Sequence, residues 1–270
     1  MNYKDIALFT DLDGTLFTSE RTVSEENRRA IRRFIDGGGS FGISTGRAPA
    51  NAGLMLPGME MNTWSVVLNG AEGYHFVRRQ SCGETSLPKK EIMALVDWVL
   101  KELPMVNVQL CTPDRLFFLS DPQFADEDFV TSHQPLEYAA PEAVAQEKWM
   151  KILFCAPRPI LQQLLDHARA TGEAGVMDSV FTNEVYLEFL PRNTNKGTRL
   201  AGLRQQPELW GKTFVAIGDY TNDIELLQEA DIAVAVANAL PAVKKIADYV
   251  VCSNDEHALA YLIDVLIPSL

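Results

Sequence analysis

Hydrophobic and polar positions change their spacing several times along the chain. Residues 6–9 form an apolar run of strand length, and residues 31–35 carry apolar side chains at helical spacing. Thr22 with Glu25 matches a capping box, and the glycines at 37–39 are residues that end helices. The pattern predicts a buried strand followed by a helix that begins just after Thr22.

Two more apolar runs follow within the first 70 residues. Residues 40–44 and 64–68 are short and read as strands, and the second run leads into the turn Asn69-Gly70. We therefore expect the order β-α-β-α-β. Strands and helices that alternate in this way build a parallel sheet with right-handed crossovers.

The pattern changes at about Cys82. An amphipathic helix is predicted over residues 92–103, and a polar, acidic connection over residues 120–145. Further predicted elements are strands at 106–110, 116–119, 150–154, 176–181 and 185–190, and a helix at 160–170. This stretch is typical of an α+β module with its own core.

Beyond Pro191 the first pattern returns, with strands near 214–217, 232–236 and 249–251 between helices that begin near 196, 221, 239 and 256. The predicted fold class is α/β: a doubly wound, mainly parallel, Rossmann-like core sheet with an inserted α+β domain. We expect the core to comprise residues 1–81 and 189–270, and the insertion residues 82–188.

Composition narrows the choice of partners. The chain has 270 residues, 47% of them hydrophobic, which is enough for a substantial core. Its net charge is −12 and it has no basic tract, which argues against nucleic acid or an anionic membrane as a partner. The four cysteines lack C-x-x-C spacing, and the first apolar run is too short for a signal peptide. We expect a cytoplasmic protein, either a monomer or a small homo-oligomer.

Polar groups follow four of the predicted core strands: Asp11 and Asp13, residues 44–47, Asn69, and residues 218–223. Taken singly, each of them is more typical of an ordinary turn or a helix cap. If the strands are parallel, however, all four groups meet at one edge of the sheet, where ligands bind in open α/β folds.

Four carboxylates would then share one cleft: those of Asp11, Asp13, Asp219 and Asp223. Such crowding raises pKa values or destabilises the fold unless a cation lies among them. Oxygen ligands without nearby His or Cys fit Mg²⁺. The sequence therefore predicts a Mg²⁺ site formed by Asp11, Asp219 and a backbone oxygen near Asp13, with Asp223 behind them.

A phosphate group opposite the metal would need hydrogen-bond donors. Suitable donors are the Thr45 hydroxyl, the Gly46 backbone N–H, the Lys196 ammonium and the Asn222 amide. Lys196 alone is more often a solvated lysine, but it lies where the chain re-enters the predicted core.

The four motifs, in this order, resemble those of the haloacid dehalogenase-like phosphatase superfamily: residues 11–15, residues 44–47, Lys196-Gly197, and residues 218–223. The insertion lies between the second and third motifs, as in the Cof-type hydrolases with a type IIB cap. The resemblance extends to residues 233–239 and 247–250. Ala237 and His257 depart from it, since glycine is usual at both positions.

This resemblance implies a Mg²⁺-dependent hydrolysis of small phosphomonoesters, such as sugar phosphates, through an aspartyl-phosphate. Asp11 would be the nucleophile and Asp13 the general acid and base. Lys196 would act with them, and Asp219 would bind the metal with support from Asp223. The residues implied for phosphate or substrate binding are Leu12, Thr45, Gly46, Arg47, Asn69 and Asn222. For Arg47, contact with substrate and pairing with an acid are equally open.

Alternatives to a phosphatase are a nucleotide-binding protein, a phosphomutase and a catalytically silent protein. No G-x-G-x-x-G follows the first strand, and Lys196-Gly197-Thr198 lacks the glycines of a P-loop, which argues against a nucleotide-binding oxidoreductase and a P-loop NTPase. A sugar phosphomutase would use the same aspartyl-phosphate. A catalytically silent sensor on this fold is a third alternative.

Overall fold

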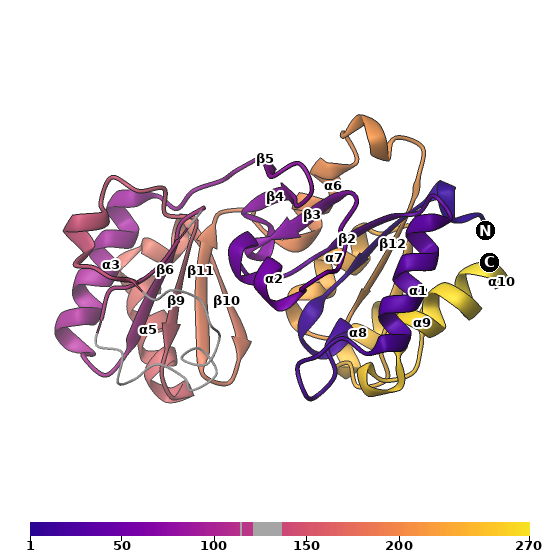
Figure 1. The fold of residues 1–270 in the computed structure, drawn as a ribbon. Helices are drawn as coiled ribbons and strands as arrows, with labels where there is room; N and C mark the ends of the chain where they lie inside the picture. Colours follow the sequence, from indigo (N-terminus) through magenta and orange to yellow (C-terminus); the bar gives the residue numbers. More distant parts are fainter. Residues whose placement is uncertain (114, 121–136) are drawn as a thin grey trace. The chain divides into compact units, whose positions relative to one another are not determined.

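The computed structural model describes residues 1–113, 115–120 and 137–270, so most of the predicted acidic connection lies outside the described residues. The chain divides into two compact units (Figure 1). The core unit comprises Met1–Arg47, Met55–Gly83 and Asn195–Leu270, and the inserted unit comprises Ala48–Leu54 and Glu84–Thr194. No helix in the described part of the chain is long and apolar enough to cross a bilayer.

The core unit is built on a five-stranded parallel sheet, which confirms the predicted fold class. Its strands, in spatial order, are β14 (Tyr249–Val250), β13 (Ile232–Ala235), β12 (Thr213–Gly218), β1 (Ile6–Thr10) and β2 (Ser40–Ile43). All five residues of β1 are buried. A parallel sheet is buried in this way because its crossover helices cover its faces.

Two groups of helices pack in the core unit. The first contains α1 (Glu25–Asp36) and α9 (Ala258–Tyr261), which lie side by side, and the chain continues helically to α10 (Ile267–Ser269) (Figure 1). The second contains α6 (Lys196–Leu203), α7 (Ile224–Glu229) and α8 (Pro241–Ile246), with α7 in contact with both of the others.

Helix α1 begins two residues later than predicted. Its N-cap is Ser24, whose hydroxyl accepts a hydrogen bond from the backbone N–H of Asn27. The predicted capping box of Thr22 and Glu25 is therefore wrong. The Thr22 carbonyl instead accepts a hydrogen bond from the backbone N–H of Thr18, within a separate turn. The predicted end of the helix is confirmed, since Gly37 is its C-cap.

A small antiparallel sheet follows β2 in the chain. It contains β3 (Trp64–Val67), β4 (Glu72–His75) and β5 (Gln80–Cys82), and its last two strands are not predicted by the sequence pattern. A parallel bridge between Ser44 and Val66 joins β3 to the end of β2. This bridge places Asn69 at the same edge of the sheet as Ser44.

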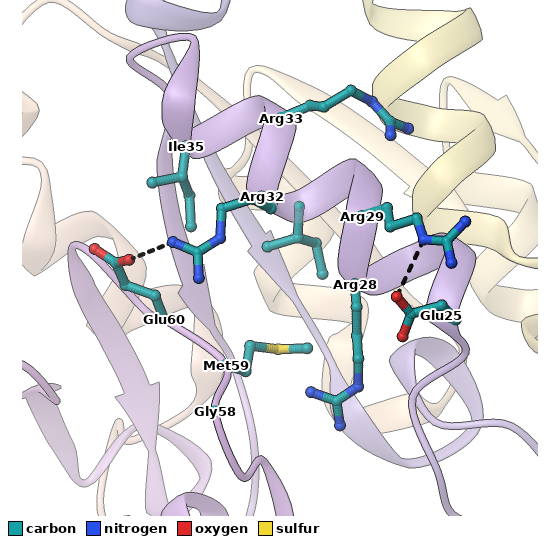
Figure 2. Close-up of a pocket in the computed structure, with 10 residues that line it drawn as sticks. Glu25, Arg28, Arg29, Arg32, Arg33, Ile35, Gly58, Met59 and Glu60 are labelled. Atoms are coloured by element: carbon teal, nitrogen blue, oxygen red, sulfur yellow. Dashed lines mark hydrogen bonds and ion pairs between the residues drawn. The ribbon is translucent and has the colours of Figure 1, made fainter.

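A groove of about 450 Å³ runs between α1 and the loop at residues 58–60 (Figure 2). Four arginines of α1 line it, and two of them form ion pairs shown there: Arg32 with Glu60, and Arg29 with Glu25. None of the predicted site residues lines this groove.

The inserted unit has its own sheet, in the order β10 (Met177–Asn183), β11 (Tyr186–Pro191), β9 (Lys151–Cys155), β6 (Asn107–Cys111), β7 (Leu116–Phe118) and β8 (Glu137–Tyr138). Side chains of α3 (Lys89–Glu102) and α5 (Arg158–Thr171) form one hydrophobic core with alternate residues of β6, β9 and β11. Helix α2 (Pro49–Met55) lies between β2 and β3 in the chain. The predicted α+β insertion is thus present.

Candidate active site

The acidic turn, residues 11–17, follows β1 directly. The backbone N–H of Asp11 donates to the Ile217 carbonyl of β12 at 3.0 Å, so the nucleophile predicted from the sequence is attached to the neighbouring strand. Gly14 has φ +81°, and a Cβ there would lie 2.6 Å from Oδ2 of Asp219. The turn therefore requires glycine both for its backbone conformation and for the approach of Asp219.

Lys196 joins two of the predicted carboxylates. Its Nζ lies 2.6 Å from Oδ1 of Asp11 and 2.6 Å from Oδ1 of Asp223, and its side chain is completely buried. The second oxygen of Asp223 accepts hydrogen bonds from the backbone N–H groups of Asp219 and Tyr220. A buried carboxylate with partners on both oxygens is satisfied, so Asp223 positions the loop after β12 and holds Lys196.

Lys196 is placed by the start of α6. The side chain of Asn195 accepts a hydrogen bond from the backbone N–H of Thr198, and the Thr198 hydroxyl accepts one from the backbone N–H of Asn195. This capping box fixes the first turn of the helix. Gly197 allows α6 to pack closely on α7, because a Cβ there would lie 2.2 Å from the Glu225 carbonyl oxygen.

Burial and neighbouring charge shift the pKa values of this group. Burial raises the pKa of Asp11 well above its ordinary value, against the lowering effect of Lys196. Burial raises the pKa of Asp219 to about 7, with a further contribution from the charge of Asp223. Burial alone would lower the pKa of Lys196, but the charges of Asp11 and Asp223 outweigh it and raise that pKa. Three carboxyl groups and one lysine thus lie together in a buried site.

Asp11, Asp219 and Asp223 form a carboxylate cluster, with one oxygen of each within 4.8 Å of the others. Oδ1 of Asp219 accepts a hydrogen bond from the Thr15 hydroxyl at 2.8 Å, and Oδ1 of Asp11 faces Lys196. Hard oxygen donors and raised carboxyl pKa values suit a divalent cation. The side chain of Asp13 is not in this cluster, since it points to Arg47.

The predicted phosphate-binding loop lies at the ends of β2 and β3. Thr45 is buried, and its hydroxyl accepts a hydrogen bond from the backbone N–H of Arg47, with Gly46 between the two residues. The backbone N–H of Asn69 donates to the Thr45 carbonyl, and the side-chain N–H of Asn222 donates to Oδ1 of Asn69 at 3.1 Å. The structure thus brings together residues from three of the four polar groups that follow the predicted core strands.

Arg47 pairs with an acid in this structure. Its Nε lies 2.9 Å from Oδ2 of Asp13, and its Nη2 lies 2.7 Å from Oδ1. Of the two roles left open by the sequence, this is the pairing role. Leu12, also predicted to bind phosphate, is buried within the acidic turn.

Three residues that support the site are not predicted by the sequence. Thr15 holds Asp219, the side-chain N–H of Asn238 donates to the Gly14 carbonyl at 2.7 Å, and Nε of Arg199 donates to the Gly70 carbonyl at 2.9 Å. Thr15 and Asn238 lie within the segments 11–15 and 233–239 that resemble the family, but their contacts span about 200 residues. Contacts over such distances cannot be predicted from the local sequence pattern.

The two departures from the family pattern differ in structure. His257 has φ +64°, the left-handed conformation that favours glycine, so a side chain there strains the backbone. Ala237 is not among the residues with positive φ, and its backbone N–H donates to the Cys252 carbonyl at 3.2 Å. Ala237 therefore fits its turn without that strain.

Comparison with known proteins identifies the family. The family model of haloacid dehalogenase-like hydrolases matches residues 8–263. The 5-amino-6-(5-phospho-D-ribitylamino)uracil phosphatase YcsE of Bacillus subtilis is 27% identical over 262 residues, which cover 95% of this chain and 94% of that protein.

Solved structures share the whole fold. A haloacid dehalogenase-like hydrolase from Bacteroides thetaiotaomicron has a TM-score of 0.84 at 23% identity, covering 97% of this chain and 99% of that one. The subclass IIB sugar phosphatase BT4131 has a TM-score of 0.80 at 18% identity, covering 96% and 98%. These likenesses confirm the predicted core with its inserted domain. The chain belongs to the haloacid dehalogenase-like hydrolase family, and it is a phosphatase of that family.

Proposed function

We propose that the protein hydrolyses small phosphomonoesters in a Mg²⁺-dependent reaction through an aspartyl-phosphate on Asp11. The observation that carries this proposal is the burial of Lys196 between Asp11 and Asp223, with Asp219 in the same cluster. A buried lysine and carboxylates at the ends of two adjacent parallel strands provide a nucleophile and groups that hold a phosphate.

Asp11 and Asp219 would hold the metal, together with a backbone oxygen near Asp13. When bound, Mg²⁺ supplies positive charge that neutralises the phosphate oxygens and the carboxylates. Thr15 fixes the orientation of Asp219 through its hydrogen bond. Asp223 fixes the backbone of the same loop. This is the role expected of a residue that orients the metal ligands without binding the metal itself.

Asp11 attacks phosphorus with a carboxylate oxygen. As that oxygen–phosphorus bond forms, the bond from phosphorus to the leaving oxygen breaks, and Asp13 gives its proton to the leaving alcohol. Asp13 then takes a proton from water, the water oxygen bonds to phosphorus, and the Asp11 oxygen–phosphorus bond breaks. Inorganic phosphate and free Asp11 are the products.

Lys196 keeps Asp11 oriented and offers positive charge to the transferring oxygens. The Thr45 hydroxyl, the Gly46 N–H and the Asn222 amide donate to the phosphate from the opposite side. Because phosphoryl transfer involves little other covalent chemistry, positioning and charge stabilisation supply most of the rate enhancement.

The substrate class follows from this chemistry and from the relatives. We propose sugar phosphates or related phosphorylated metabolites, since YcsE is named for a phosphoribityl compound and BT4131 is a sugar phosphatase. We assign to the inserted unit the role of the cap that selects the substrate and excludes water. The four cysteines are all free thiols, which fits a reducing cytoplasm.

Phosphate release tests the proposed function. The protein, assayed with Mg²⁺ against an aryl phosphate and a panel of phosphorylated metabolites, is expected to release phosphate, and EDTA is expected to abolish the release. Asp11→Asn is expected to fold normally and to lose turnover. Absence of EDTA-sensitive release across the panel contradicts the proposal, and an isomerised sugar phosphate without free phosphate identifies a phosphomutase instead.

A further inference from the structure

The ion pair of Arg47 and Asp13 occupies both oxygens of the proposed acid. The two contacts, of 2.9 and 2.7 Å, form the parallel fork that guanidinium and carboxylate groups prefer. The Asp13 side chain is 51% exposed and that of Arg47 is 24% exposed, whereas the Lys196 side chain is completely buried. The pair therefore lies where a dissolved anion reaches it.

The backbone of Arg47 is fixed to the phosphate-binding loop. Its N–H donates to the Thr45 hydroxyl, and its carbonyl accepts a hydrogen bond from the backbone N–H of Leu68, next to Asn69. The guanidinium thus extends from the loop whose Thr45 and Gly46 are proposed to bind phosphate. Its backbone is held by two hydrogen bonds, and its side chain is partly exposed.

In the proposed reaction Asp13 must reach the leaving oxygen and then a water molecule. With both of its oxygens accepting from Arg47, the Asp13 carboxyl faces the guanidinium, whereas general acid–base catalysis requires hydrogen-bond contact with the reacting oxygen, directly or through one water. The arrangement described by the structure is therefore not the reacting one, and Arg47 and Asp13 must separate first.

We propose that Arg47 is a positioning residue that holds Asp13 aside until the phosphate group of the substrate takes over its guanidinium. This inference rests on the proposed function. A phosphate dianion presents oxygens that match the same fork, so phosphate and Asp13 compete for Arg47. Arrival of the substrate then releases the acid at the moment when it is needed, and an empty site keeps it paired.

Binding of inorganic phosphate tests this competition directly. Titration calorimetry at fixed Mg²⁺ would compare the wild type, Asp13→Asn, Arg47→Ala and the double variant. Asp13→Asn keeps the shape of the side chain and removes its charge. We expect it to tighten phosphate binding about fivefold, the scale of an exposed ion pair of about 1 kcal/mol. In the Arg47→Ala background the same substitution is expected to leave the affinity unchanged.

Each other outcome overturns the inference. Equal tightening in both backgrounds shows that Asp13 repels phosphate by charge alone, without competing for Arg47. Unchanged or weaker binding by Asp13→Asn shows that the pair does not oppose phosphate, and no binding by any variant shows that Arg47 does not capture it. Thermal melting verifies that each variant is folded, and Asp13→Ser replaces Asp13→Asn if the latter is not.

The proposed function is judged separately, by turnover of phosphomonoesters by the wild type. A wild type that hydrolyses them but lacks the coupling between Asp13 and Arg47 refutes the inference alone. A wild type that shows the coupling but no EDTA-sensitive turnover refutes the proposed function alone. Arg47→Lys keeps the charge without the fork. In that background Asp13→Asn is expected to tighten phosphate binding by less than half of the effect seen with Arg47 present.

Discussion

Nζ of Lys196 lies 2.6 Å from Oδ1 of Asp223, and neither side chain is exposed to solvent. The same ammonium contacts Asp11, and the other Asp223 oxygen holds the backbone of Asp219. The two aspartates proposed as nucleophile and metal ligand are thus linked through one lysine and one carboxylate.

Asp223→Ala is expected to lower the free energy of unfolding by about 3–5 kcal/mol, because it leaves the buried Lys196 with one partner fewer. Urea unfolding measures the loss, and kcat for an aryl phosphate is expected to fall with it. Glu25→Ala is the matched control. It breaks the exposed pair with Arg29, so a change of at most about 0.5 kcal/mol is expected. Equal losses in the two variants would contradict the central role of Asp223.

Mg²⁺ is expected to raise the melting temperature more at pH 8 than at pH 6. In the metal-free protein the pKa of Asp219 is raised to about 7, from 3.8, mainly by burial. Between about pH 4 and 7 the folded state then binds more protons than the unfolded state, so this contribution to stability is lost as pH rises through 7. Mg²⁺ needs the ionised carboxylates and offsets that loss at the higher pH.

Differential scanning fluorimetry at several pH values, with and without Mg²⁺, checks this expectation. Asp219→Asn is expected to remove most of the Mg²⁺ effect and to flatten the pH dependence of the metal-free protein. A Mg²⁺ shift that is independent of pH, or one that survives in Asp219→Asn, would refute the ligand assignment.

Gly14→Ala is expected to abolish turnover and to destabilise the protein by more than the strain of a left-handed alanine, about 1–2 kcal/mol. Its Cβ would lie 2.6 Å from Oδ2 of Asp219. Gly211→Ala is the matched control, because Gly211 has φ +73° with open space around it. That variant is expected to show the backbone strain alone, with normal kcat. Chemical denaturation and phosphate release measure both effects.

His75 is expected to make the protein less stable as pH falls below about 6.5. It is buried, and burial lowers its pKa, with a further contribution from the charge of Arg78. The unfolded chain takes up a proton near pH 6.5 that the folded chain resists, so the free energy of unfolding decreases on acidification. His75→Gln is expected to reduce this slope between pH 7 and 5, as urea unfolding would show. An unchanged slope would exclude His75 as its source.

The sequence predicts those parts of the fold and site that depend on local pattern. Asp11 and Asp219 follow apolar runs, and parallel strands bring the ends of such runs together. The start of α1 is misplaced because Thr22 and Ser24 are both good caps and the sequence pattern does not distinguish them. The hairpin of β4 and β5 is missed because its buried Glu72 and His75 break the apolar pattern of a strand.

The parts of the site that the sequence does not predict depend on contacts between residues far apart in the chain. The fork between Arg47 and Asp13 joins two motifs 34 residues apart, and the hydrogen bond from Asn238 to Gly14 joins residues 224 apart. Sequence pattern identifies these residue types but not their partners. For Arg47 it leaves two roles open, and the structure shows the contact with the Asp13 carboxylate.

The hydrogen bond from Asp11 to Ile217 holds the acidic turn to a strand that lies about two hundred residues later in the chain. Every residue of the carboxylate cluster, together with Lys196, belongs to the core unit, although more than a hundred residues of the inserted unit separate them in the chain. Adjacent strands, and not chain continuity, keep these residues together. The inserted unit is thus free to change its sequence during evolution without moving the residues proposed to carry the reaction.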